Sequence, residues 1–128
     1  MRFISVGEAN RLCEQETGSQ QLRDFNLLDS AVARPQNYVA YAEGEPDLHM
    51  AAAHLLFGIV SNHPFVDGNK RVGLKATAVF YILNGWELDG EDSDVYGLVL
   101  DVAEGNLNVP EIALRLRPMV RKLELPDE

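Results

Sequence analysis

The fold of this chain is decided by the stretch LHMAAAHLLFGIVSNHPFVDGNKRVGLKATAVFYILN, residues 48–84. Two apolar runs in it are separated by a short polar loop. The first run, from Asp47 to about Ser61, is apolar nearly all round, too long for a strand and too short to span a bilayer, so it predicts a buried central helix. The second run predicts a helix that stops at Asn84-Gly85. We expect the two helices to pack together and to hold the loop between them rigidly.

The loop itself, HPFVDGNKR at residues 63–71, gathers the groups of a candidate phosphate site. A helix N-terminus leaves its first N–H groups without internal partners and carries partial positive charge, so the turn through Gly68 and Asn69 can receive an anion. Both residues tolerate the left-handed conformations of an anion-binding nest. Lys70 and Arg71 add two positive charges, and the planar guanidinium suits phosphate oxygens. The expected ligand is a polyphosphate.

Two further residues of the loop point to a transfer reaction. Asp67 places a carboxylate beside the phosphate cradle, which makes electrostatic sense if Mg²⁺ lies between them. Histidine is the side-chain type whose ordinary pKa lies closest to neutrality, so His63 is the natural general base for a hydroxyl nucleophile. Helix capping would explain an aspartate or an asparagine here, but not the histidine and the two cations. For Phe65 we expect a core position rather than a contact with a ligand. Together the polar residues are the parts of a phosphoryl-type transfer.

At these residues the sequence resembles the Fic/Doc superfamily. Its larger branch carries HxFx(D/E)GNGRxxR, and its Doc (death-on-curing) branch carries HxFx(D/N)(A/G)NKR, which HPFVDGNKR matches. Lys70 and Leu74 stand where the larger branch has a glycine and a second arginine. A second run, LRDFNLLDSAVARPQ at residues 22–36, is similar to the Doc-like pattern LRDxxLLxSAxARPQ. One departure is Val72-Gly73, where relatives often have a Thr-Ala pair.

The resemblance implies a Fic fold and an ATP- and Mg²⁺-dependent transferase. Enzymes of the larger branch transfer AMP to a hydroxyl side chain, whereas the Doc-type change is associated with ATP bound in the opposite sense, so that the γ-phosphoryl group is transferred. The implied roles are catalysis by His63, metal binding by Asp67, and phosphate binding by Gly68, Asn69, Lys70 and Arg71.

The resemblance also implies the biological setting. It predicts a toxin of a toxin–antitoxin module that blocks translation, with elongation factor Tu as the protein substrate and a Phd-like antitoxin as partner. Many Fic proteins carry an autoinhibitory [S/T]xxxE[G/N] segment, but Val39 and Leu100 stand where the two Glu-Gly pairs of this chain would need Ser or Thr. Control in trans is therefore expected. A Fic-type AMP transferase and a catalytically silent antitoxin-binding module stay open as alternatives.

Length, net charge and cysteine content limit which classes of protein this chain can belong to. At 128 residues the chain suits a single domain, residues 1–128. Eleven basic and twenty acidic residues give a net charge of −9, which argues against direct binding of nucleic acid. The single cysteine, Cys13, excludes an internal disulfide and is expected to be buried. There is no apolar signal stretch and no run long enough to cross a membrane, so we expect a cytoplasmic protein.

The segment before the central helix predicts two more helices. One begins at the capping box of Ser5 and Glu8 and stops at Gly18. A short one around residues 27–32 is expected to end at Arg34-Pro35, because a proline pushes the residue before it out of the α region. Residues 36–46 would then be irregular. The resemblance places a flap over the active site there, and a plain surface loop is an equal alternative.

The segment after residue 84 completes the predicted fold. Trp86–Asp89 alternates and suggests a short strand, and a helix with an apolar stripe follows, stopping near Gly105. The last helix begins around Pro110, with a kink or an early end at Pro118. His49 and His54 are five residues apart and do not share a helix face, so they are interpreted as structural rather than as zinc ligands. The prediction is an all-α domain of about six helices, with a short β-hairpin or flap as an optional addition.

Overall fold

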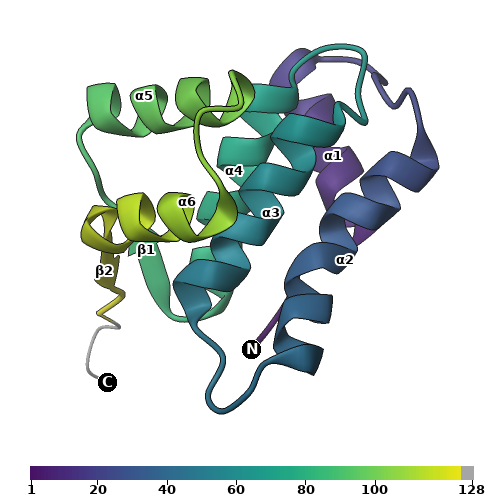
Figure 1. The fold of residues 1–128 in the computed structure, drawn as a ribbon. Helices are drawn as coiled ribbons and strands as arrows, with labels where there is room; N and C mark the ends of the chain where they lie inside the picture. Colours follow the sequence, from purple (N-terminus) through teal and green to yellow (C-terminus); the bar gives the residue numbers. More distant parts are fainter. Residues whose placement is uncertain (125–128) are drawn as a thin grey trace.

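The computed structural model describes residues 1–124 and confirms the predicted all-α fold (Figure 1). Six α-helices, one 3₁₀ turn and a two-stranded sheet make up this part of the chain. The helices are α1 (Val6–Thr17), α2 (Phe25–Tyr41), α3 (Leu48–Asn62), α4 (Asn69–Leu83), α5 (Asp92–Ala103) and α6 (Val109–Leu116). The remaining elements are β1 (Trp86–Leu88), η1 (Arg117–Met119) and β2 (Val120–Lys122).

Helix α3 forms the centre of the packing. It begins after Asp47, whose side chain accepts a hydrogen bond from the His49 N–H at 2.8 Å. Helices α2, α4 and α6 all pack against α3, and Figure 1 shows it crossing the middle of the molecule. Its leucine, isoleucine and valine side chains facing these neighbours are fully buried, and each contributes about 1.5–3 kcal/mol by leaving water. The predicted central helix is confirmed.

Two glycines let the neighbouring helices approach α3 closely. A Cβ atom at Gly58 would lie 3.0 Å from the Ala31 Cα atom of α2. At Gly73 of α4, a Cβ atom would lie 2.7 Å from the Val60 Cγ2 atom. A glycine inside a helix costs about 1 kcal/mol relative to alanine. Here that cost is offset by close packing, which gives the departure at Gly73 from the family pattern a structural reason.

Helix α2 is longer than predicted. The expectation that it ends at Arg34-Pro35 is wrong, because Pro35 lies inside the helix, which continues to Tyr41. A proline within a helix costs about 3 kcal/mol through the lost N–H and a clash with the preceding turn. Pro35 is buried, as is Ala31 one turn earlier, on the side that packs against α3. Tertiary packing therefore outweighs the local preference.

Residues 36–46 do not form the flap that the resemblance implied. Residues 36–41 continue α2, and only the short connection 42–47 is irregular. This connection leads into the N-terminal end of α3, whereas the HPFVDGNKR loop follows its C-terminal end (Figure 1). The two ends of a 15-residue helix lie about 22 Å apart. The connection therefore cannot cover the site from the position that the resemblance suggested.

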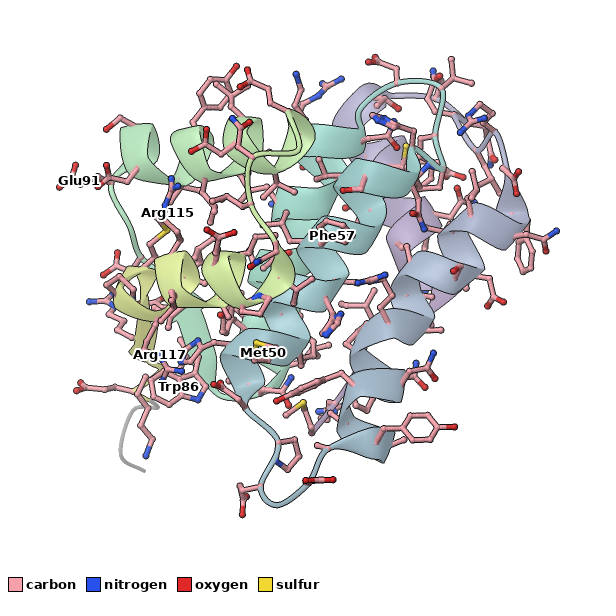
Figure 2. All side chains as sticks on the ribbon, viewed as in Figure 1. Met50, Phe57, Trp86, Glu91, Arg115 and Arg117 are labelled. Carbon is pink, nitrogen blue, oxygen red and sulfur yellow. The ribbon has the colours of Figure 1, made fainter. Side chains whose placement is uncertain are left out.

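A small antiparallel sheet closes the C-terminal part of the chain. The predicted strand at Trp86 is present as β1, and α6 ends before Pro118, as expected. Beyond η1 the chain is extended rather than helical, and Val120 pairs with Leu88 in the β1–β2 register. Figure 2 shows Arg117 and Trp86 at this end of the molecule. The sheet is therefore not a hairpin, since it joins segments far apart in the sequence.

The two histidines of α3 occupy structural positions. The His49 Nδ1 atom lies 2.9 Å from the Tyr81 hydroxyl oxygen, and the His54 Nδ1 atom lies 3.2 Å from Nη2 of Arg34. Burial and then the charge of Arg117 lower the pKa of His49, while burial and then the charge of Arg34 lower the pKa of His54. Both imidazoles are therefore held neutral in the folded protein near pH 7.

In residues 1–124 no helix combines the length and the apolar character that crossing a membrane requires.

The lowered pKa values of His49 and His54 predict that the folded protein loses stability on mild acidification. Their ordinary pKa of 6.5 is lowered on folding, so below that pH the unfolded chain takes up protons before the folded one does. The free energy of unfolding should fall between about pH 7.5 and pH 5.5. Urea titrations at the two pH values should show a smaller fall for the His49→Gln/His54→Gln double variant. An identical fall in both proteins would contradict this assignment.

Candidate active site

The HPFVDGNKR loop joins α3 to α4 and is paired with the connection between α1 and α2. Figure 1 shows both connections at the same end of the molecule. Leu22 and Phe65 form an antiparallel bridge, and the Val66 N–H donates to the Gln21 carbonyl at 2.7 Å. The Phe65 side chain is buried, as predicted. Backbone pairing and one core anchor therefore fix the middle of the loop.

Asn69 closes the loop from the first turn of α4. Its Oδ1 accepts a hydrogen bond from the Phe65 N–H at 3.0 Å, and its Nδ2 donates to the Phe65 carbonyl at 2.9 Å. The side-chain amide thus holds the loop through one acceptor and one donor, and the main-chain N–H at the start of α4 is also open to a phosphate. No side chain among residues 1–124 caps α4. The N-terminus of α4 therefore presents open N–H groups to an anion.

Gly68 brings the loop close to the end of α1. Its φ of 85° lies in the left-handed region, and a Cβ atom there would lie 2.7 Å from the Thr17 Cγ2 atom. Both the conformation and the contact require glycine at this position. Cys13 of α1 lies beneath the same loop and is fully buried, and burial raises the pKa of its thiol. The predicted core role of Cys13 is confirmed.

Arg71 is oriented by two oxygen atoms. Its Nη1 donates to the Glu16 carbonyl of α1 at 3.1 Å, and its Nη2 lies 3.4 Å from Oδ2 of Asp67. The Asp67 side chain is 70% exposed, and surface ion pairs of this kind contribute only about 0–1 kcal/mol. Asp67 and Arg71 can therefore exchange this contact for a metal ion and a phosphate at little cost.

The polar residues predicted for the site line one pocket of about 250 Å³. Its walls are His63, Val66, Asp67, Gly68, Asn69, Lys70, Arg71 and Ala103. Arg71 also borders a neighbouring pocket of about 330 Å³, whose apolar wall is formed by Leu74, Ala78, Leu88 and Val95. The structure thus brings together every residue that the sequence suggested, and the chemical role of each stays a prediction.

Mg²⁺ takes one or two carboxylates and completes its coordination with water and substrate oxygens. The exposed carboxylate of Asp67 fits that arrangement, because the open N–H groups beside it could hold the phosphate oxygens that share the metal ion. Within residues 1–124 there is no cluster of three or more His, Cys, Asp or Glu side chains suited to hold a metal ion by themselves. Asp67 could hold Mg²⁺ together with the oxygens of a bound polyphosphate.

His63 has an unusual backbone conformation. With φ 50° and ψ 55° it is the one residue other than glycine that has a positive φ in the described part of the chain. Such conformations cost about 1–3 kcal/mol and cluster at functional sites. The guanidinium of Arg23 donates from Nε to the His63 carbonyl at 3.1 Å and also from Nη2.

Comparison with known proteins identifies the family. A family model described as "Fic/DOC family" matches residues 5–81, more than half of the chain. The chain belongs to the Fic/DOC family. It is 40% identical over 102 residues to a protein named Toxin Doc from Mycolicibacterium smegmatis, covering 77% of this chain and 78% of that relative. The resemblance to the Doc branch, based on the HPFVDGNKR and LRDFNLLDSAVARPQ patterns, is thereby confirmed.

Three residues that contact the site had no predicted role. Arg23 lies within the second pattern of this Fic/DOC chain, so a signal existed in the sequence, but nothing local connects it with His63, 40 positions away. Glu16 contributes a main-chain carbonyl, which any residue type could supply. Thr17 is the last residue of α1, and its side chain lies beside Gly68. Only the tertiary structure brings these three residues to the loop.

The close contact at Gly68 predicts that a side chain there destabilises the fold more than a side chain at another glycine of positive φ. The Gly68→Ala variant must bear both left-handed strain and overlap with Thr17, whereas Gly105→Ala has a similar φ of 77° but meets nothing within 4 Å. We expect Gly105→Ala to lose about 1–2 kcal/mol from strain alone, and Gly68→Ala to lose at least about 1 kcal/mol more. Chemical denaturation measures both. Equal losses would show that the contact with Thr17 relaxes freely.

Proposed function

We propose that this Fic/DOC chain is a Doc-like toxin that acts as an ATP- and Mg²⁺-dependent protein phosphotransferase on a Ser or Thr hydroxyl. One observation carries the proposal. The uncapped N-terminus of α4, two cations, an exposed carboxylate and an imidazole all line the same pocket. Phosphoryl transfer depends mainly on positioning and on stabilising charge at the phosphate oxygens, and these groups supply both.

In the proposed reaction, the N–H groups at Gly68 and Asn69 together with Lys70 and Arg71 bind the phosphates of ATP. His63 accepts the proton of the target hydroxyl as its oxygen forms a bond to the γ-phosphorus. The bond between that phosphorus and the bridging oxygen breaks, and ADP leaves. Mg²⁺, held by Asp67 and the phosphates, would neutralise part of the negative charge.

Two neighbouring pockets share Arg71, and we propose that one binds the phosphates of ATP and the other its nucleoside part. The pocket of about 250 Å³ at the loop is small for a whole nucleotide, because ligand sites usually have about 300–1,000 Å³. The neighbouring pocket has an apolar wall and shares Arg71, so it suits the nucleoside part. Glu16 and Asp92 also line this pocket, and their carboxylates would repel phosphates but could accept hydrogen bonds from hydroxyl or amino groups.

We further propose elongation factor Tu as the protein substrate, arrested translation as the result, and a Phd-like antitoxin as the partner that controls the toxin. The name of the relative, Toxin Doc, supports a toxin–antitoxin setting. Such a substrate would place the protein in the cytoplasm.

The reaction can be tested with isotopically labelled ATP. We expect elongation factor Tu incubated with the protein, ATP and Mg²⁺ to gain label from γ-labelled but not from α-labelled ATP, with a mass increase of one phosphate. Gain of AMP would favour the Fic-type alternative. Absence of ATP binding with the motif intact would favour the catalytically silent antitoxin-binding module.

His63 can be tested with two variants that differ in backbone preference. His63→Ala removes the base, and His63→Asn removes it while keeping a residue type that tolerates the left-handed region. Both should lower the transfer rate by about 10²–10⁴-fold, the usual contribution of a general base, and abolish growth arrest on expression. Thermal unfolding should confirm that both variants fold. A folded variant that remains toxic would overturn the role of His63.

A further inference from the structure

We propose that Arg23 is a positioning residue, which holds the main chain of His63 in the left-handed conformation that directs the imidazole into the pocket. The inference deepens the proposed function, on which it rests for the role of His63 as the base. The hydrogen-bond geometry, however, can be tested without any activity.

The conformation of His63 requires an external restraint. A histidine enters the left-handed region more readily than most residues, but still at a cost. Pro64 follows directly, and a proline pushes the residue before it toward extended conformations. Left to local preferences, the His63 backbone would be extended, and the imidazole would leave the pocket wall. Something outside the loop must therefore stabilise the observed φ of 50°.

Arg23 has the geometry to provide this restraint. Its Nε and Nη2 both donate to the His63 carbonyl, with an Nε distance of 3.1 Å. Its main-chain N–H donates to the next carbonyl, that of Pro64, at 2.8 Å. Main chain and side chain of one residue thus hold two consecutive carbonyls. This fixes the peptide between His63 and Pro64 relative to the segment that carries Arg23.

That segment is itself rigid. The Leu22–Phe65 bridge precedes Arg23. Asp24, directly after it, caps α2 by accepting a hydrogen bond from the Leu27 N–H at 3.1 Å. Arg23 therefore lies between a backbone bridge and a helix cap. The main chain of Arg23 is thus fixed on both sides, so its guanidinium reaches the His63 carbonyl from a defined position.

No other role in the described structure accounts for the Arg23 guanidinium. It forms no ion pair with any carboxylate of residues 1–124. Its side chain is exposed, so water can satisfy the His63 carbonyl if the guanidinium is removed. Loss of Arg23 should consequently affect the orientation of His63 more than the stability of the fold. A lysine offers one compact donor group instead of a planar fork and should restore the contact only in part.

The test compares Arg23→Ala and Arg23→Lys with Arg11→Ala, which removes the same charge from the exposed face of α1. In NMR spectra, the coupling between the amide and α protons of His63 reports φ, and the imidazole signals report its surroundings. For Arg23→Ala we expect a His63 coupling that moves toward the extended value and shifted imidazole signals. Arg23→Lys should be intermediate, and Arg11→Ala should match the wild type.

Kinetics supply the second measurement. Arg23→Ala should lower kcat for phosphoryl transfer by about 10–100-fold, as expected for a misplaced catalytic group, with the KM for ATP nearly unchanged. Unchanged His63 signals in Arg23→Ala, or a rise in KM alone, would overturn the proposal. If the wild-type protein transfers no phosphoryl group, the proposed function fails and the NMR comparison alone decides on Arg23.

Discussion

The close packing of α3 against α2 and α4 is the constraint on which the rest of the structure depends. Gly58 and Gly73 lie at the two contacts, where a methyl group would already overlap with the neighbouring helix. Because the middle of α3, from Ala51 to Val60, is largely buried, the helix is held in place by the core. One end carries the loop that begins at His63. The other is fixed by Asp47, which caps the helix and pairs with Arg117 at 2.8 Å.

The candidate site places two cationic side chains together on an acidic protein. The chain has a net charge of −9, yet the open end of α4 combines unpaired N–H groups with Lys70 and Arg71. A local cluster of this kind would suit the polyphosphate that we propose as ligand. The carboxylate of Asp67 offsets part of this positive charge and could hold the divalent cation of the proposed reaction. The fold thus gathers two cations and open N–H groups at one pocket of a protein that is acidic as a whole.

Within the loop, structural and chemical roles are divided between backbone and side chains. The Asn69 amide holds the Phe65 main chain, and Gly68 permits close approach to α1, so both residues shape the loop around the pocket. His63 shows the reverse arrangement, since its carbonyl is held by the protein while its side chain lines the pocket. The unfavourable backbone conformation of His63 is maintained by contacts from a distant segment.

The sequence by itself determined the features encoded by neighbouring residues. Caps and glycine stops located the first helix, the apolar run located α3, and HPFVDGNKR identified the pocket and the family. Only the tertiary structure decided the continuation of α2 through Pro35, the pairing of Val120 with Leu88, and the contact between Arg23 and His63. The physical reason is the same in each case. These features depend on contacts between residues distant in the sequence, and such contacts override or supplement local preferences.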